Sequence, residues 1–197
     1  MAVKLQRHAL GITWVEQNAM ARAAHALVAG ERVWLIDPYE HPDALAAAAE
    51  LGTPAGVLQL LDRHNRDCRA IAERLGVPLL RLPVDAAETP FQAVPVISNR
   101  GWREVALWWA DERALIVAEA VGTAPAFALG RAAGVHPMLR LTPPRKQLSP
   151  FAPERLLVGH GKALESGADA ALREALAHAR HDLPRLLLSV PKLLRGR

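Results

Sequence analysis

A chain of 197 residues, 51% of them hydrophobic, is long enough to bury the core of one domain unaided. Its formal charge of +4 is spread along the sequence and aromatic residues make up only 5%, so no basic stripe or base-stacking surface is visible and a nucleic-acid partner is not expected. No apolar run approaches the roughly 18 to 20 residues that span a bilayer, and the lone cysteine, Cys68, excludes an internal disulfide. We therefore expect a single domain over residues 1–197 in a soluble, cytoplasmic protein.

The first half of the chain predicts an antiparallel opening followed by a strand-helix-strand unit. Short β-branched and aromatic runs indicate strands, and apolar residues at helical spacing between Pro, Asn and Gly boundaries indicate helices. The predicted strands span residues 12–15, 25–28, 32–37, 57–61 and 78–82, and the predicted helices span residues 41–51 and a segment from an N-cap at Asn65 to Gly76.

The second half predicts three antiparallel strands, a late strand and a helix. We expect residues 122–134 to be partly helical, residues 136–145 to be irregular, and a basic helical tail to begin at about residue 182. The predicted strands span residues 93–97, 104–109, 114–118 and 155–158, and the predicted helix spans residues 168–180. Together these elements indicate an α/β fold with a sheet core and helices on its outer faces.

One polar loop stands out as a candidate site. Residues 62–68 read Asp-Arg-His-Asn-Arg-Asp-Cys and follow the buried strand at 57–61 directly. Ligands collect at the carboxyl ends of such strands, so these side chains are candidates for binding or catalysis.

The order of four landmarks resembles the metallo-β-lactamase superfamily. These are the early strand Val33-Trp34-Leu35-Ile36-Asp37-Pro38, the loop at 62–68, the strand leading into Glu119, and the turn Gly159-His160-Gly161. The resemblance runs from about residue 10 to about residue 180. It implies an αββα sandwich, in which two mixed sheets are flanked by helices.

The resemblance also implies a metal site, but most of its positions are changed. The family carries His-x-His-x-Asp-His in the loop, where this chain has Asp62, His64 and, one residue late, Asp67-Cys68. Glu119 stands for a bridging aspartate and His160 for the last histidine, whereas a middle histidine has no counterpart. The remaining histidines are read as surface or packing residues: His8, His25, His41, His136, His178 and His181.

Each candidate ligand also has a structural interpretation. Asp62 and Asp67 suit ion pairs with neighbouring arginines or the free amides of a helix start. Cys68 lies on the apolar side of its helix as a core thiol, although a place in the first helical turn is expected to lower its pKa. For His64 and His160, a hydrogen-bonded imidazole and a metal ligand both remain open.

Two functions follow from these alternatives. The favoured one is a non-catalytic protein or binding module for a small anionic ligand, with Arg63 and Arg66 replacing the positive charge of a metal and with no cofactor. The alternative is a hydrolase of an ester, thioester or phosphoester that uses a single zinc, iron or manganese ion. The sequence leaves open whether the protein is an enzyme and whether it forms a homo-oligomer.

Overall fold

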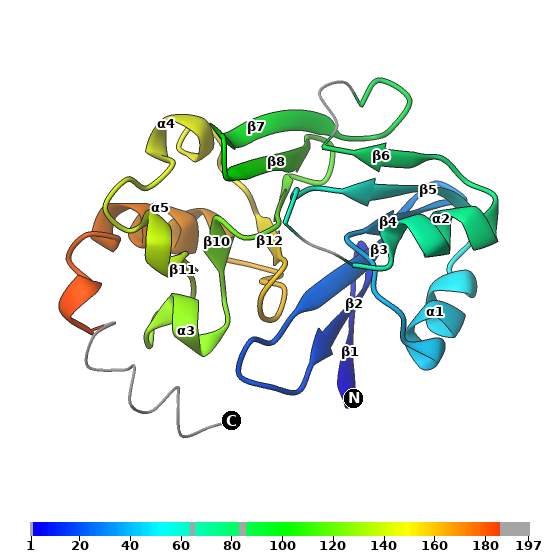
Figure 1. Cartoon of the computed structure of the whole chain (residues 1–197), viewed down its shortest axis with the longest axis horizontal. Coiled ribbons are helices and arrows are strands. Elements are labelled where there is room, and N and C mark those ends of the chain that lie inside the picture. Colours follow the sequence, from blue (N-terminus) through cyan, green and yellow to red (C-terminus); the bar gives the residue numbers. More distant parts are fainter. Residues whose placement is uncertain (1, 64–65, 83–85, 186–197) are drawn as a thin grey trace.

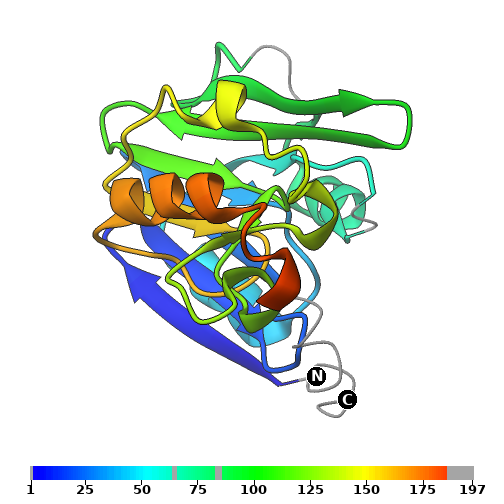
Figure 2. The same ribbon diagram turned by 90° about the vertical axis from the view of Figure 1, so that its left-hand side faces the viewer.

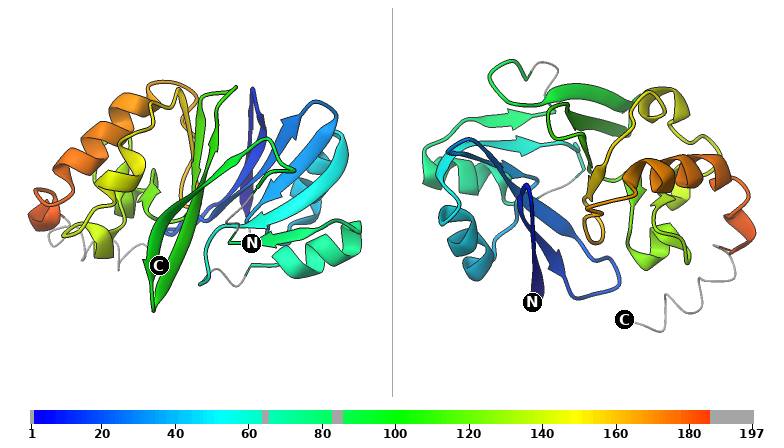
Figure 3. Two further views of the ribbon diagram at one scale, coloured as in Figure 1. Left: turned by 90° about the horizontal axis from the view of Figure 1, so that it is seen from above. Right: turned by 180° about the vertical axis from the view of Figure 1, so that it is seen from behind.

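A computed structural model describes residues 2–63, 66–82 and 86–185. In this described part, a six-stranded sheet (β1-β2-β3-β4-β5-β6) faces a four-stranded sheet (β12-β9-β8-β7), and helices lie on the outer side of each (Figure 1). Seen from above, the layers follow one another as helix, sheet, sheet, helix (Figure 3). The predicted αββα sandwich is therefore confirmed.

The first sheet begins as an antiparallel meander and continues as two parallel crossovers. Helix α1 connects β4 to β5, and helix α2 connects β5 to β6, so the predicted strand-helix-strand unit is confirmed. Strand β1 was not predicted, because it is an edge strand in which polar side chains dominate. The elements are β1 (Val3–His8), β2 (Gly11–Glu16), β3 (Ala23–Ala29), β4 (Arg32–Ile36), α1 (Pro42–Ala49), β5 (Thr53–Gln59), α2 (Cys68–Leu75) and β6 (Leu79–Arg81).

The second sheet contains the predicted antiparallel strands, and β12 joins β9 in parallel. Its elements are β7 (Gln92–Asn99), β8 (Trp102–Trp109), β9 (Ala114–Val117) and β12 (Arg155–Val158). The connection from β9 to β12 contains β10 (Val121–Gly122), α3 (Pro125–Ala128), β11 (Gly134–Val135), the 3₁₀ helix η1 (Pro137–Leu139) and α4 (Arg145–Leu148), and α5 (Ala168–His178) follows β12. Among the described residues, no helix is long and apolar enough to cross a membrane.

Helix α2 starts later than its sequence predicts. Its N-cap is Asp67, so the predicted N-cap at Asn65 is wrong, and Asn65 itself lies outside the described residues. Within the described residues the Asp67 side chain does not cap the helix, because its Oδ2 accepts the backbone N–H of Glu40 at 2.8 Å. The predicted tail falls largely on residues 186–197, which are also outside the described residues.

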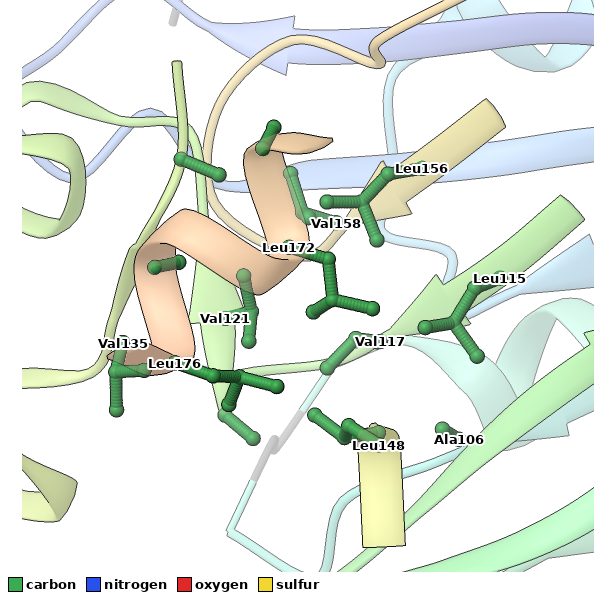
Figure 4. Packing of buried hydrophobic residues seen from close by; sticks show 14 of the residues in the cluster. Ala106, Leu115, Val117, Val121, Val135, Leu148, Leu156, Val158, Leu172 and Leu176 are labelled. Carbon is green, nitrogen blue, oxygen red and sulfur yellow. The ribbon is translucent and has the colours of Figure 1, made fainter. Parts of the chain in front are cut away.

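The apolar side chains form three layers, and alternation along the strands assigns each side chain to one of them. Trp34 and Ile36 face the four-stranded sheet, whereas Val33 and Leu35 face α1 and α2. On the far side, α5 crosses the outer face of the second sheet (Figure 2) and packs Leu172 and other side chains against it (Figure 4).

The two adjacent tryptophans at the end of β8 lie on opposite faces, because successive side chains of a strand alternate. Trp109 is buried between the two sheets, 5.3 Å from the ring of Phe91. Trp108 lies on the outer face, and its ring is 5.2 Å from that of Phe151. Strand β8 therefore contributes one large side chain to each of two apolar layers.

The layer between the sheets provides a first test of the fold. Ile116 is 1% exposed there, so Ile116→Ala is expected to lower the free energy of unfolding by about 2 to 5 kcal/mol through lost burial and a residual cavity. Leu5→Ala, at a residue 36% exposed on β1, is the control and is expected to cost less than about 1 kcal/mol. Urea unfolding measures both, and equal losses would contradict the layer assignment.

Candidate functional site

Four polar side chains meet where strands end at one rim of the sandwich. Arg63 follows β5, Glu119 follows β9, His136 follows β11 and His160 follows β12. The residues therefore come from distant parts of the sequence, and the fold brings them together at the carboxyl ends of strands.

Glu119 lies at the centre of this group. Its Oε1 atom is 3.8 Å from Nε2 of His136 and 3.8 Å from Nε2 of His160. Its Oε2 atom accepts a hydrogen bond of 3.0 Å from Nη2 of Arg63. The Glu119 carboxylate therefore bonds one guanidinium and lies close to two imidazoles.

The two glycines beside His160 are required by close backbone packing. A Cβ atom at Gly159 would lie 2.1 Å from the carbonyl oxygen of Ala118. At Gly161, φ is +111°, and a Cβ atom would lie 2.2 Å from Oγ1 of Thr123. The Gly-His-Gly turn therefore places His160 against the segment after β9, which contains Glu119.

Hydrogen bonds to the backbone assign the protons of both imidazoles. Nδ1 of His136 accepts the N–H of Met138 at 3.1 Å, so in the neutral ring the proton lies on Nε2, facing Glu119. Nδ1 of His160 donates to the carbonyl of Met20 at 2.8 Å, because a carbonyl only accepts. Burial lowers the pKa of His136, which is therefore a neutral N–H donor near neutral pH.

His136 is predicted from the sequence to be a surface or packing residue, and its ring does pack against Trp102 and Phe127. The sequence does not predict its approach to Glu119, because no other metal-ligand residue type lies near His136 at a spacing typical of a binding motif. The one indication in the sequence is that His136 directly follows a short strand, β11, much as His160 follows β12.

Trp102 and Glu104 lie beneath this group. The indole ring of Trp102 lies under the guanidinium of Arg63, whose central carbon is 4.0 Å from the ring centroid. Its Nε1 atom donates to Oε2 of Glu104 at 3.1 Å, and Oε1 of Glu104 accepts the backbone N–H of Glu119 at 2.8 Å. Burial raises the pKa of Glu104 to about 7, although these N–H groups act in the opposite direction.

Arg66, the second predicted anion-binding residue, bonds the backbone of the protein. Its guanidinium turns inward and donates to three backbone carbonyls, those of Ala23, of Asp37 at 2.9 Å and of Gly159 at 3.2 Å. These carbonyls belong to the start of β3, the end of β4 and the end of β12, so one side chain joins both sheets. Because these donors are used on the backbone, the expectation that Arg66 binds an anion is not supported by its placement.

The other predicted ligands point to separate partners. Asp62 pairs with Arg103 at 3.6 Å, and Asp67 is held by the backbone of Glu40. Cys68 is 1% exposed, and its Sγ faces the carbonyl of Pro38 at 3.7 Å. Burial raises the pKa of this thiol far above its ordinary value, so the predicted lowering is wrong: the apolar layer under α2 outweighs the helix start.

The described residues do not assemble a site for a zinc, iron or manganese ion. In residues 2–63, 66–82 and 86–185, no group of three or more His, Cys, Asp or Glu side chains is arranged to hold a metal, and His64 lies outside these residues. Glu119 does meet both His136 and His160, but the guanidinium of Arg63 already pairs with that carboxylate and would repel a divalent cation.

A cavity of ≈ 790 Å³ lies beside His160, between the β2–β3 turn, the segment at 123–125 and the loop at 161–164. Small apolar side chains dominate its lining, together with Lys162, and neither Arg63, Glu119 nor His136 borders it. The cavity is therefore a neighbour of the candidate site.

The described architecture matches solved structures of metallo-β-lactamases. One from Erythrobacter litoralis superimposes with a TM-score of 0.63 at 12% identity, covering 91% of this chain and 92% of that one. The metallo-β-lactamase DIM-1, in a crystal exposed to ceftazidime, gives a TM-score of 0.61 at 9% identity, covering 92% of this chain and 98% of that one. The chain has the metallo-β-lactamase fold. No protein-family model and no curated protein matches its sequence.

The metallo-β-lactamase fold of this chain is expected to depend on Arg66. Arg66→Met removes the guanidinium that donates to three backbone carbonyls, so we expect the free energy of unfolding to fall by about 3 kcal/mol. Arg69→Met, at an exposed arginine on α2, is the matched control. Urea unfolding compares the two variants, and an equal effect would show that Arg66 does not join the sheets.

Glu104 is expected to make stability depend on pH. In the unfolded chain its carboxyl loses the proton near 4.5, whereas the folded protein retains it up to about 7, so stability falls as pH rises through this window. This shift corresponds to about 3 kcal/mol, lost between these two pH values. Glu104→Gln is expected to remove that fall, whereas Glu73→Gln, at an exposed carboxyl on α2, is expected to keep it. Urea unfolding as a function of pH measures the difference.

Proposed function

We propose that this chain is a metal-independent binding protein that holds a small oxyanion, a carboxylate or a phosphate, at Arg63. The observation that supports this most directly is the placement of the Arg63 guanidinium, which lies on the indole of Trp102 and bonds Glu119 through one N–H group. A cytoplasmic location, predicted from the lone cysteine, is part of the same proposal.

Arg63 has the chemistry that such a ligand needs. Its side chain is 37% exposed, and among the described residues it donates one side-chain hydrogen bond, to Glu119, so further N–H groups remain for a ligand. A planar guanidinium binds carboxylate or phosphate oxygens in a two-pronged geometry. The Nε2–H of His136 faces the same carboxylate and offers a second donor.

Glu119 acts in this proposal as an internal counter-ion. Its carboxylate lies 3.0 Å from Arg63, so an incoming oxyanion is repelled by Glu119 and competes with it for the guanidinium. Binding therefore requires Arg63 to exchange one carboxylate for another anion. The competition lowers affinity and selects ligands that offer more oxygens or more charge than Glu119.

Isothermal titration with inorganic phosphate and with acetate tests this arrangement. Glu119→Gln removes the competing charge and is expected to tighten binding by about tenfold, whereas Arg63→Met is expected to abolish it. Arg32→Met is the matched control, because Arg32 also lies over an indole, that of Trp34, but away from the site. A preference for phosphate or for acetate separates the two ligand classes, and loss of binding in Glu119→Gln would contradict the proposal.

The alternative hydrolase gives the opposite result for the same carboxylate. If Glu119 and His160 are metal ligands, protein purified without chelator contains a stoichiometric metal ion by elemental analysis, and Glu119→Gln and His160→Ala both lose it. We expect the parent protein to contain almost no metal. A stoichiometric ion in the parent that disappears in both variants would replace the binding proposal by the hydrolase.

A further inference from the structure

The first residues of β8 contact Arg63, Glu119 and His136. We propose that Trp102 and Glu104 are its positioning residues: Trp102 holds the guanidinium of Arg63 in place, and Glu104 holds both Trp102 and the turn that carries Glu119. This inference rests on the proposed function, and it concerns residues that do not themselves touch the ligand.

Trp102 is fixed from three directions. It is 4% exposed, one face of its indole supports Arg63, and its ring meets the ring of His136 edge-on, with centroids 4.9 Å apart. Its N–H group donates to Glu104. Because the indole has no freedom to rotate, the guanidinium stacked on it keeps one orientation and presents the same edge to a ligand.

Glu104 connects the two sides of the site. One of its oxygens accepts from the indole of Trp102, and the other accepts from the backbone N–H groups of Glu119 and Ala120 at 2.8 and 2.9 Å. Glu104 is 1% exposed, so water does not compete for these bonds. A single buried carboxyl therefore sets the position of Arg63, through Trp102, relative to Glu119.

The backbone of β8 holds the loop from which Arg63 extends. The N–H of Asp62 donates to the carbonyl of Arg103 at 3.1 Å, and the N–H of Val105 donates to the carbonyl of Leu60 at 2.9 Å. The backbone directly before Arg63 and the guanidinium of Arg63 are thus both held by the same strand. A ligand gains affinity from this because the arginine is already ordered before binding.

Phosphate or acetate titration of variants on β8 tests the inference, with the anion that the parent binds as the probe. Trp102→Leu removes the stacking face and is expected to weaken binding by about tenfold, whereas Trp102→Phe keeps an aromatic face and is expected to weaken it less. Trp108→Leu is the matched control, because Trp108 is on the same strand but packs against Phe151 on the outer face. We expect Trp108→Leu to bind like the parent, and urea unfolding confirms that each variant is folded.

Fluorine NMR of protein labelled with fluorotryptophan provides a readout that needs no ligand. The chain has five tryptophans, and Trp102→Phe and Trp108→Leu assign two of the resonances. Arg63→Met and Glu104→Gln are each expected to shift the Trp102 resonance and to leave that of Trp108 in place. A role of Trp102 in core packing alone would not make its resonance depend on Arg63.

The outcomes separate the two proposals. A parent protein that binds neither anion ends the proposed function, while the NMR arm still decides whether Trp102 and Glu104 position Arg63. A parent that binds while Trp102→Leu binds equally well, or while Trp108→Leu loses as much affinity, overturns the positioning inference and leaves the proposed function standing. A Trp102 resonance that ignores both Arg63→Met and Glu104→Gln overturns it as well.

Discussion

The guanidinium of Arg66 is the interaction on which the arrangement at the rim depends. Strands β3, β4 and β12 begin or end there, and carbonyl groups at strand ends lie beyond the regular ladder. Arg66 donates to one carbonyl at the end of each of these strands and so adds a donor where the ladder stops. Because the carbonyls come from both sheets, the positive charge that satisfies them also fixes how the sheets meet.

This internal cation changes what the rim can bind. Burial lowers the pKa of Arg66, and the neighbouring carboxyl of Asp37 acts in the opposite direction. An arginine stays protonated despite such a shift, so this guanidinium supplies a positive charge inside the protein. The loop that carries Arg66 also carries Arg63, which lies against Glu119. The described rim therefore already contains two cations, one bonded to its carbonyls and one bonded to this carboxylate.

The sequence was sufficient for the fold because the fold is encoded in local patterns. The β-branched and aromatic run at residues 32–37 and the apolar spacing in α2 can be recognised without any knowledge of the site. The site could be predicted only in part: the places of Arg63, Glu119 and His160 at strand ends were visible, but their partners were not. Asp67 shows why, since a backbone N–H from Glu40, distant in sequence, draws its carboxylate away from the helix that it was expected to cap.

His136 and Cys68 show two further limits of sequence reasoning. The approach of His136 to Glu119 depends on the long connection between β9 and β12, whose course no spacing rule fixes. For Cys68 the sequence indicates two opposite effects on the pKa of the thiol. A helix start lowers it by favouring the thiolate, and an apolar layer raises it. Their balance depends on burial, which only the assembled core determines, and a thiol that is 1% exposed belongs to the core.

The two arginines of one loop differ in whether their partners can be exchanged, and this difference points to Arg63 as the ligand-binding group. The carbonyls that hold Arg66 are part of the backbone of both sheets, so releasing them disrupts the fold. The carboxylate that holds Arg63 is a side chain that can rotate, and a ligand oxyanion reproduces its charge and its oxygen atoms. A divalent cation at Glu119 would instead have to displace a guanidinium that Trp102 keeps in place, leaving two cations close together. Exchange of one anion for another costs less electrostatic energy than insertion of a second cation, so the arrangement around Arg63 favours an anionic ligand.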